Sequence, residues 1–147
     1  MSPPSPRDQR AGQSPVTIGF VEQVDLPEWE VFALPAKVDT GALSSAVHVE
    51  NLCTWEDGWL SFDLPLEQGG GSRRNVEARL VRMGQVRSTT GKTERRPFVA
   101  TRLCLGHLEQ VIEVGLVDRG AMNYRMLIGR AALAGRFVVD PARCFLL

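Results

Sequence analysis

Hydrophobic residues recur at every second position over several short runs of this chain, and each run ends at turn-forming residues. Between residues 76 and 80, Val, Ala and Leu alternate with Glu and Arg, and a similar alternation returns over 99–105 and 112–116. A period of two is typical of strands that bury one face and expose the other. This patterning favours strands over helices for most of the chain.

Turn signals divide the remaining sequence in the same way. Further strands are expected over 16–24 and over 31–38, the second interrupted near Pro35, and Asp57-Gly58 predicts the tip of a hairpin. A single short helix is expected over 130–134, with a glycine ending it. Many short strands with one late helix indicate an all-β fold, either a barrel or a sandwich-like arrangement.

The first fifteen residues differ from the rest in composition. They hold four of the nine prolines, together with Ser, Gln and Gly, and contain almost no apolar side chains. Such a segment buries too little surface to offset its ordering entropy, so residues 1–15 are expected to form a disordered tail. Residues 16–147 then form one domain, since domains commonly contain about 100–150 residues.

Charge and composition narrow the classes of partner. Seventeen Lys and Arg side chains balance seventeen Asp and Glu side chains. The chain therefore has no excess of positive charge to neutralise a phosphate backbone, and nucleic acid is not expected as a partner. No apolar stretch approaches the roughly 18 residues that a membrane helix needs, so no membrane association is expected either. The first residues lack the apolar core of a secretory signal, which favours a cytoplasmic protein.

The three cysteines, Cys53, Cys104 and Cys144, lie far apart and form no Cys-x-x-Cys pair. Neither a disulfide framework nor a thiolate zinc site is indicated, and reduced, mostly buried thiols are expected. No Gly-x-x-x-x-Gly-Lys-Ser/Thr phosphate-binding loop is present either, so no cofactor is expected.

The most informative segment begins at Ala36, where an apolar strand leads directly into Asp39-Thr40-Gly41. The carboxylate then lies at the end of the strand, and Gly41 lets the backbone turn tightly. The Thr40 hydroxyl can bond to the local backbone or to a second chain. Asp and Gly are also common turn residues, so an Asx-type turn that closes a hairpin is the ordinary explanation of the tripeptide alone.

Two further features favour a functional turn. An apolar strand over 126–128 ends in Gly129-Arg130, just before the expected helix, and a polar, glycine-centred hairpin tip covers residues 87–93. With an Asp-Thr-Gly-Ala turn, a glycine-tipped flap and a Gly-Arg strand in this order, the chain resembles the retropepsin-like aspartic proteases. The resemblance implies an all-β, retropepsin-like acid-protease barrel with one short C-terminal helix and one lobe per chain.

One bacterial branch of that class is more similar still. The stretches that carry this resemblance lie at 37–48, 94–97, 117–119, 126–130 and 137–141. The branch goes by the name of ATP-dependent zinc proteases and is associated with the RimK-type ATP-grasp glutamate ligase, which makes such a ligase an expected partner. The similarity spans about residues 16 to 147.

Aspartic protease chemistry requires two carboxylates that share one proton: one activates water as a base, and the other polarises the scissile carbonyl. The chain holds a single Asp-Thr-Gly. Asp118 and Asp140 lack the adjacent Thr-Gly, so salt bridges or turn caps are expected for them. One domain of this length leaves no room for a second lobe. A twofold homodimer that joins Asp39 with the Asp39 of another copy is therefore expected.

Residue roles follow from the resemblance. Asp39 is the implied catalytic carboxylate, with Thr40 bonding across the dimer axis and Gly41 contacting the substrate backbone. An extended peptide would lie between this turn and the flap, held by main-chain hydrogen bonds. The implied substrate-binding residues are Ala42, Ser88, Thr89, Thr90, Gly91, Lys92 and Ile128, and the implied supports of the turn are Gly129 and Arg130.

The sequence departs from viral retropepsins at Leu43. In those enzymes an acidic residue at this position can pair with the arginine of Gly-Arg, so the partner of Arg130 is open here. Metal chemistry has little support, because His48 and His107 are the only histidines and no His-Glu-x-x-His motif is present; no metal site is expected. The three tryptophans are expected in the core or at a dimer contact.

The sequence thus predicts a cytoplasmic, homodimeric aspartic endopeptidase that hydrolyses extended peptides. The association with the ligase suggests glutamate-tailed or ribosomal proteins as substrates. Two other classes remain open: a non-catalytic peptide-binding or regulatory module that acts with the ligase, and a zinc-dependent peptidase. Replacing Asp39 by Asn separates the first two classes, and chelation tests the third.

Overall fold

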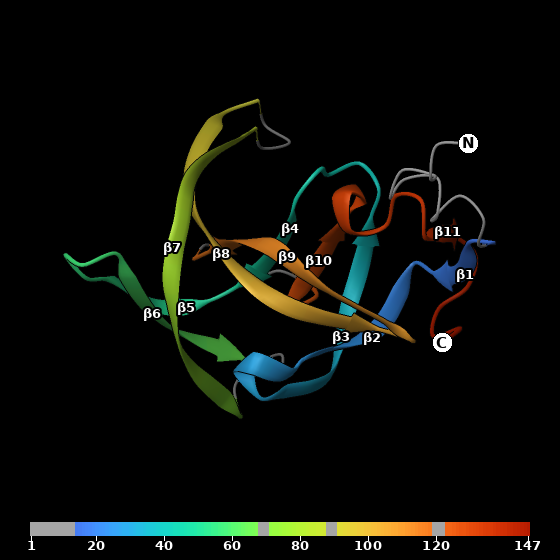
Figure 1. The fold of residues 1–147 in the computed structure, drawn as a ribbon, viewed down its shortest axis with the longest axis horizontal. Helices are drawn as coiled ribbons and strands as arrows, with labels where there is room; N and C mark the ends of the chain where they lie inside the picture. Colours follow the sequence, from blue (N-terminus) through green and yellow to red (C-terminus); the bar gives the residue numbers. More distant parts are fainter. Residues whose placement is uncertain (1–13, 68–70, 88–90, 119–122) are drawn as a thin grey trace, which may run out of the picture.

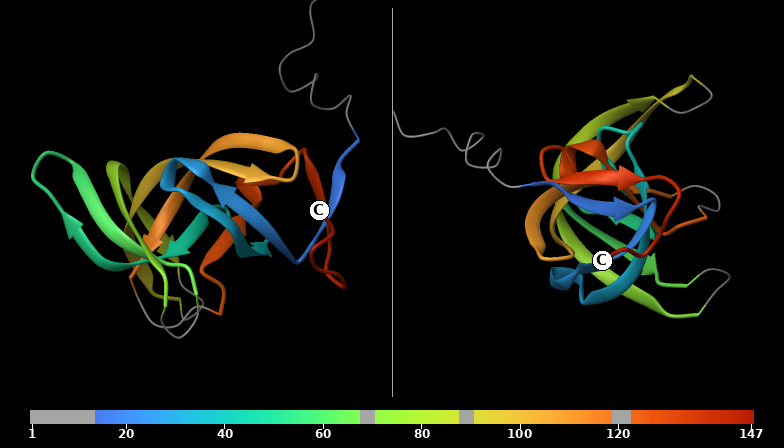
Figure 2. Two further views of the ribbon diagram at one scale, coloured as in Figure 1. Left: turned by 90° about the horizontal axis from the view of Figure 1, so that it is seen from below. Right: turned by 90° about the vertical axis from the view of Figure 1, so that its right-hand side faces the viewer.

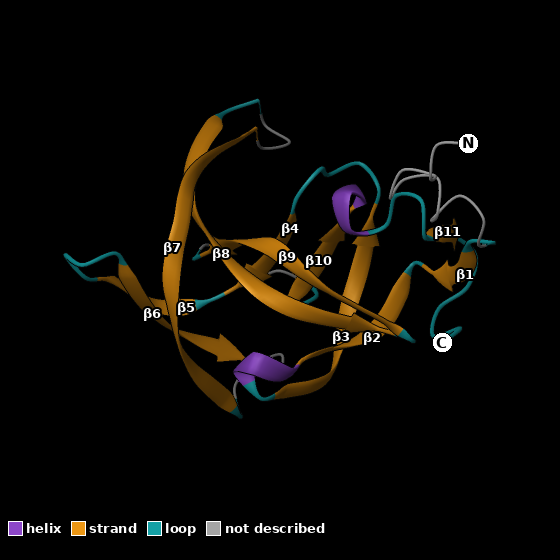
Figure 3. Cartoon of the chain, viewed as in Figure 1, coloured by secondary structure: helices purple, strands orange, loops and turns teal. Residues whose placement is uncertain are grey.

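The computed structural model describes residues 14–67, 71–87, 91–118 and 123–147, and it is almost entirely β-structure (Figures 1 and 3). Its two helical elements are 3-10 turns, η1 (Pro27–Trp29) and η2 (Arg130–Ala132). No helix in these residues has the length and apolarity that a membrane span requires. The strands, in chain order, are β1 (Val16–Gly19), β2 (Val21–Leu26), β3 (Val31–Asp39), β4 (Ser45–His48), β5 (Glu50–Thr54), β6 (Trp59–Pro65), β7 (Arg73–Arg87), β8 (Thr93–Leu105), β9 (Leu108–Val117), β10 (Met126–Gly129) and β11 (Phe137–Asp140).

The strands form one long sheet and one small one. The nine-stranded sheet has the order β2-β3-β10-β4-β9-β8-β7-β6-β5, and β2 also pairs with β8 through Asp25 and Cys104. This pairing closes β2, β3, β10, β4, β9 and β8 into a barrel, while β7, β6 and β5 extend from its side (Figures 1 and 2). β1 and β11 pair in parallel as a separate two-stranded sheet. The expected all-β, barrel-like fold is confirmed.

The alternation in the sequence corresponds to the buried face of these strands. In β6, for example, Leu60, Phe62 and Leu64 are buried, whereas the residues between them keep part of their surface exposed. Trp29 packs edge-on against Phe62, with the ring centroids 5.5 Å apart. Fully burying a Leu or Phe side chain contributes about 1.5–3 kcal/mol, so one continuous core stabilises the barrel and its register.

Three local expectations need correction. The run over 16–24 is broken at Phe20, because β1 pairs with β11 while β2 pairs with β3. β3 is not broken at Pro35, which pairs with Gln23; the irregularity expected near it is a shift in the register with β2 between Val31 and Leu34, where Ala33 has a φ of +55°. The helix expected over 130–134 is a tighter 3-10 turn over 130–132, and the chain then bends at a glycine with a φ of +81°.

The tryptophans and the cysteines differ in their exposure. Trp29 is buried in the core, whereas Trp55 and Trp59 are 58% and 38% exposed and lie outside it, so a dimer contact stays the expectation for these two. Cys53 and Cys144 are also exposed, so the expectation of mostly buried thiols was wrong for them. Both tryptophans and Cys53 belong to the β5–β6 hairpin beyond the closed barrel, where no other described element covers one face of the sheet. Of the tail expected over 1–15, only the last two residues are described, and both are exposed.

Glu22 of β2 is charged and yet only 1% exposed. Its Oε2 atom accepts hydrogen bonds from the amides of Gly19 at 2.7 Å and Leu146 at 2.9 Å, and its Oε1 atom accepts one from the amide of Leu147 at 3.2 Å. A buried carboxylate is stable only when such donors replace water. Glu22 therefore holds the last residues of the chain against β2.

Candidate active site

The turn after β3 contains the residues expected to be catalytic. Asp39 is the last residue of β3, and it lies beside Gly129 of β10 in parallel register. Its Oδ1 atom accepts a hydrogen bond from the Gly41 amide at 3.0 Å, and its carbonyl oxygen accepts one from the Ala42 amide at 3.3 Å. The chain thus makes the Asx-type turn, and this turn orients a carboxylate that keeps part of its surface open. An oriented, accessible carboxylate can serve as a general base.

Gly129 supports this turn because the loop before β4 lies directly on it. A Cβ atom at Gly129 would come within 2.5 Å of the carbonyl carbon and oxygen of Ser44, and within 2.7 Å of the Leu43 oxygen. The Gly129 amide also donates to the buried Ser45 hydroxyl oxygen at 3.1 Å. Only glycine allows this approach of the two backbones.

Arg130 bonds to the same loop through its side chain and its backbone. Its Nη1 atom donates to the carbonyl oxygen of Gly41 at 3.2 Å, and its amide donates to the carbonyl oxygen of Ala42 at 2.8 Å. The next amide, from Ala131, donates to Leu43 at 3.1 Å. The partner that the sequence left open is therefore a backbone carbonyl of the Asp-Thr-Gly turn, which needs no acidic side chain at Leu43.

The hairpin of β7 and β8 rises at the same end of the barrel as the turn after β3 (Figures 1 and 2). Gly91 has a φ of +83° and is exposed, as is Lys92. Ser88, Thr89 and Thr90, expected to be part of the flap, lie outside the described residues. A hairpin in this position can lie over an extended peptide bound at the turn. Ile128, expected to line the substrate pocket, is instead fully buried in the core.

An apolar hollow of about 480 Å³ opens beside the turn. Thr40 and Arg130 form its polar side. Its apolar lining includes Phe20, Val38, Leu133, Phe137, Val139 and Pro141. Apolar side chains therefore border the polar turn on this side.

Asp140 and the two histidines lie away from the Asp-Thr-Gly turn in sequence and, in the part of the chain that the structure describes, form no cluster with it. Asp140 accepts a hydrogen bond from the Ala142 amide at 2.9 Å, which is the turn cap expected for it. His48 is buried with its Nε2 atom 3.8 Å from Glu50, whereas His107 is exposed in the turn between β8 and β9. Among the described residues, no three His, Cys, Asp or Glu side chains are grouped closely enough to hold a metal ion.

Two ionisable groups away from the turn have shifted pKa values. Hydrogen bonds from the Asn51 and Asn75 side-chain amides lower the pKa of Asp63 below 3.8, and the nearby Arg73 adds to this effect. Burial raises the pKa of the Cys104 thiol, and neighbouring carboxylates raise it further. Both groups lie in the sheet, so the shifts report structural hydrogen bonding and burial rather than catalysis.

Sequence reasoning did not identify two groups that hold the turn. The Ser45 hydroxyl is 4% exposed and accepts the Gly129 amide, and the Gly41 carbonyl accepts the Arg130 guanidinium. Ser45 is the first residue of an otherwise apolar strand, and a buried hydroxyl requires a hydrogen-bond partner, so the sequence contained an indication for Ser45. Nothing in the sequence indicated that the Gly41 carbonyl would bind Arg130.

A closed barrel whose β3 ends in an Asp-Thr-Gly turn, held by a Gly-Arg strand, defines the retropepsin-like class of proteins. The model of the RimB-like family, described as the retropepsin-like aspartic endopeptidase RimB, matches residues 17–147. The chain belongs to this family. The matching description contains no reference to zinc.

Curated relatives are longer proteins. The chain is 37% identical over 130 residues to a probable alpha-L-glutamate ligase of Parasynechococcus marenigrum, and 33% identical over 134 residues to one of Shewanella pealeana. These matches cover 86% and 88% of this chain but 28% and 29% of the relatives. The chain thus spans less than a third of the length of the curated relatives it matches.

A similar solved structure is that of Lpg0085 from Legionella pneumophila, a protein described as having unknown function. The two structures have a TM-score of 0.71 and 32% sequence identity. The match covers 90% of this chain and 98% of the Legionella chain. The common fold therefore extends over nearly the whole of both chains.

Proposed function

We propose that the chain is an aspartic endopeptidase that works as a homodimer, with Asp39 of each copy forming one half of the catalytic dyad. The observation that carries the proposal is the oriented, partly exposed Asp39 carboxylate in a chain of the RimB-like family. The two carboxylates share one proton, because like charges at hydrogen-bond distance cannot both ionise at low cost. The ionised carboxylate takes a proton from water while the protonated one polarises the scissile carbonyl.

The second carboxylate comes from a second copy that docks beside the turn. The apolar hollow next to Thr40 and the exposed Phe20 and Val138 provide surface that a partner would bury. Within the described residues β11 pairs only with β1, so its other edge is free to pair with a strand of the partner. Thr40 lies at the border of this surface, where it would meet its counterpart.

The substrate is an extended peptide, and the relatives indicate its chemistry. In relatives named probable alpha-L-glutamate ligase, the matching segment is part of one polypeptide with the rest of the protein. An endopeptidase joined to a ligase can cleave the glutamate chain that the ligase makes. Proteins with a glutamate tail are thus the expected substrates, a RimK-type ligase is the expected partner, and a cytoplasmic location suits both.

The same relatives favour one second candidate. Their names describe only the ligase, although about 28% of the length of the Parasynechococcus relative matches this chain. A non-catalytic module that binds the glutamate tail and regulates the ligase would use the same turn and hairpin without a dyad.

The test is the Asp39→Asn variant. The purified chain is incubated with a carrier protein ending in α-linked glutamates, and products are identified by mass spectrometry. Cleavage is expected to fall about 1,000-fold or more, the usual cost of removing a catalytic group, with dimer mass unchanged by sedimentation. Glu109→Gln, which neutralises an exposed carboxylate on β9 away from the turn, is the matched control and should retain full activity.

Each alternative gives a different result in this assay. Undiminished cleavage by the Asp39→Asn variant would refute the proposed dyad. Binding of the tail without cleavage by the unmodified chain would favour the regulatory module. Loss of cleavage on adding a chelator, with the dimer intact, would favour a zinc-dependent peptidase.

A further inference from the structure

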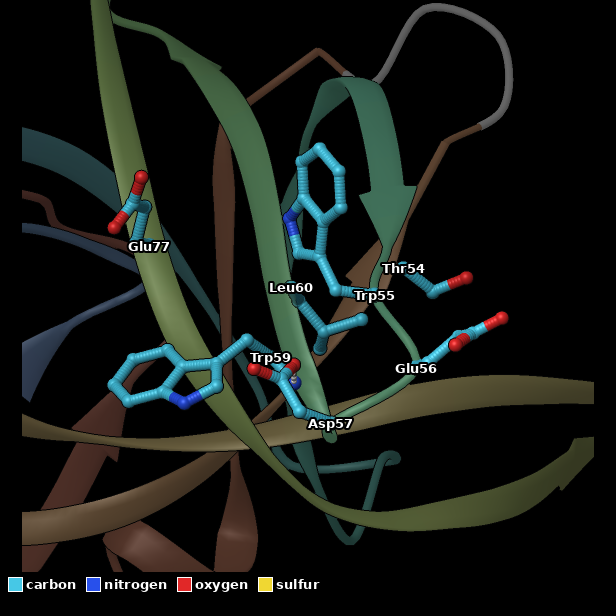
Figure 4. Close-up of a pocket in the computed structure, with 7 residues that line it drawn as sticks. All are labelled: Thr54, Trp55, Glu56, Asp57, Trp59, Leu60 and Glu77. Atoms are coloured by element: carbon cyan, nitrogen blue, oxygen red, sulfur yellow. Dashed lines mark hydrogen bonds between the residues drawn. The ribbon is translucent and has the colours of Figure 1, made fainter.

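The tip of the β5–β6 hairpin carries a second hollow, away from the Asp39 turn (Figures 1 and 4). It encloses about 790 Å³, and Trp55 and Trp59 line it. Three carboxylates also line it, those of Glu56, Asp57 and Glu77. Figure 4 shows Glu77 of β7 on the same side of the hairpin as the two indoles.

The chemistry of this surface suits a ligand that combines apolar rings with a cation. The Arg79 guanidinium lies 5.0 Å from the Trp59 ring centroid, so a cation already stacks on one indole. Within the described part of the chain, Glu77 and the two hairpin carboxylates form no ion pair. The Asp57 carboxylate accepts a hydrogen bond from the Trp59 amide at 3.2 Å, which leaves its charge without a cation. Exposed indoles bordered by carboxylates that form no ion pair can therefore bind proline rings next to an arginine or lysine.

The chain itself contains a segment with this composition. The stretch Pro3-Pro4-Ser5-Pro6-Arg7 holds three prolines just before an arginine, and it lies outside the described residues. Positions three apart share one face of a polyproline II helix, which has three residues per turn. Proline-rich segments of this type bind to aromatic-lined grooves. Residues 1–13 also carry two arginines against one aspartate, so their charge is opposite to that of the hollow.

We propose that the Trp55–Trp59 hairpin binds the Pro3–Arg7 segment of another copy of the chain. The prolines pack against the indoles, and the guanidinium pairs with Glu77. A second copy provides the segment because β1, the first described strand, lies at the end of the molecule opposite to this hairpin (Figure 1). The surface is separate from the Asp39 turn, so this interaction does not depend on the proposed peptidase activity.

Tryptophan fluorescence tests the contact directly. A synthetic peptide with the sequence of residues 1–13, which contains no tryptophan, is titrated into the dilute full-length chain. A saturable blue shift of the emission is expected, and it should be lost in the Trp55→Ala variant. The peptide carrying Arg7→Glu should bind at least tenfold more weakly. Equal binding of a scrambled peptide, or unchanged binding by Trp55→Ala, would overturn the proposal.

A charge exchange separates the specific contact from general electrostatic attraction. The full-length Glu77→Arg variant should bind the Arg7→Glu peptide at least tenfold more tightly than the unmodified chain does. The matched control is Glu113→Arg, an exposed position on β9, which should not restore binding. Failure of Glu77→Arg to restore binding, or equal restoration by Glu113→Arg, would refute the pairing.

Sedimentation velocity tests whether the segment acts between copies. As the concentration of the full-length chain increases, its average mass is expected to exceed the mass of the smallest stable species. The Arg7→Glu chain should lose this rise, whereas Asp39→Asn should keep it. An unchanged rise in the Arg7→Glu chain would exclude the segment as the link.

Discussion

Replacing Glu22 by leucine would remove the acceptor of three backbone amides in one step. The Gly19 amide is buried and would be left without a partner, at a cost of about 1–3 kcal/mol. Leu146 and Leu147 are 38% and 48% exposed, so their amides regain water but lose charge-assisted bonds worth about 1.5–3 kcal/mol each. Removing a buried charge also removes its desolvation cost, so the expected net loss is about 3–5 kcal/mol.

Urea unfolding followed by circular dichroism measures this loss. For a chain of this size the loss corresponds to a fall in melting temperature of roughly 10–16 °C. Glu22→Gln keeps one acceptor oxygen but turns the side-chain amide NH2 group, a donor, toward a backbone N–H, so its loss should be smaller, about 1.5–3 kcal/mol. The matched control is Glu113→Gln, which removes an exposed 2.8 Å ion pair with Arg82 and should cost no more than about 1 kcal/mol.

A second measurement separates loss of this contact from general destabilisation. Hydrogen exchange at the amides of Leu146 and Leu147 should be faster in both Glu22 variants, while exchange in β6 changes only as much as the global stability does. If Glu22→Leu unfolds within about 1 kcal/mol of the unmodified chain, the carboxylate does not hold the chain end. If the leucine variant does not fold, the Glu22→Gln variant provides the test. Unchanged slow exchange of the Leu146 and Leu147 amides in that variant would also show that the carboxylate does not hold the chain end.

Three further predictions concern the turn, a surface carboxylate and a thiol. Gly129→Ala would place a Cβ atom 2.5 Å from the backbone of Ser44, so the variant should lose about 1–3 kcal/mol of stability in thermal melts. It should also fail to cleave the glutamate-tailed protein. A fully active variant would contradict the close approach of the two backbones. Because two asparagine amides lower the pKa of Asp63, its carboxylate adds stability above its ordinary pKa of 3.8, and this stability is lost as the pH falls through the lower folded value. Asn75→Ala should raise that pKa in an NMR titration and move the loss to higher pH; an unchanged pKa would exclude the amide as its cause. Burial raises the pKa of Cys104, so iodoacetamide near pH 8 should alkylate the exposed Cys53 about tenfold faster than Cys104. Equal rates of alkylation by mass spectrometry would argue against the raised pKa.

The fold class could be predicted from the sequence because a sheet with one buried face requires alternation in each strand. Leu60, Phe62 and Leu64 of β6 meet that requirement locally, without information from the rest of the chain. The turn at Asp39 was also predictable, since the Asx hydrogen bond to Gly41 joins residues only two apart. Short-range physical rules therefore account for these features.

The features that could not be predicted depend on contacts between distant residues. Glu22 reaches an amide 124 residues further along the chain, and Arg130 reaches a carbonyl 89 residues before it. Nothing in the local pattern around either residue specifies that partner. Trp55 and Trp59 pose the opposite problem: their hydrophobicity predicts burial, but the hairpin that carries them has no layer packed on that face.

The position of β10 between β3 and β4 has a consequence for the order of events during synthesis. β10 is made late, yet the turn at Asp39 takes its supports from Gly129 and Arg130. A nascent chain therefore carries an unsupported turn until residues 126–131 have left the ribosome and inserted between two strands made much earlier. Pairing over such long separations is slow compared with local hairpin formation. A peptidase of this topology would stay inactive during its own translation, and a prematurely terminated chain would lack the site altogether.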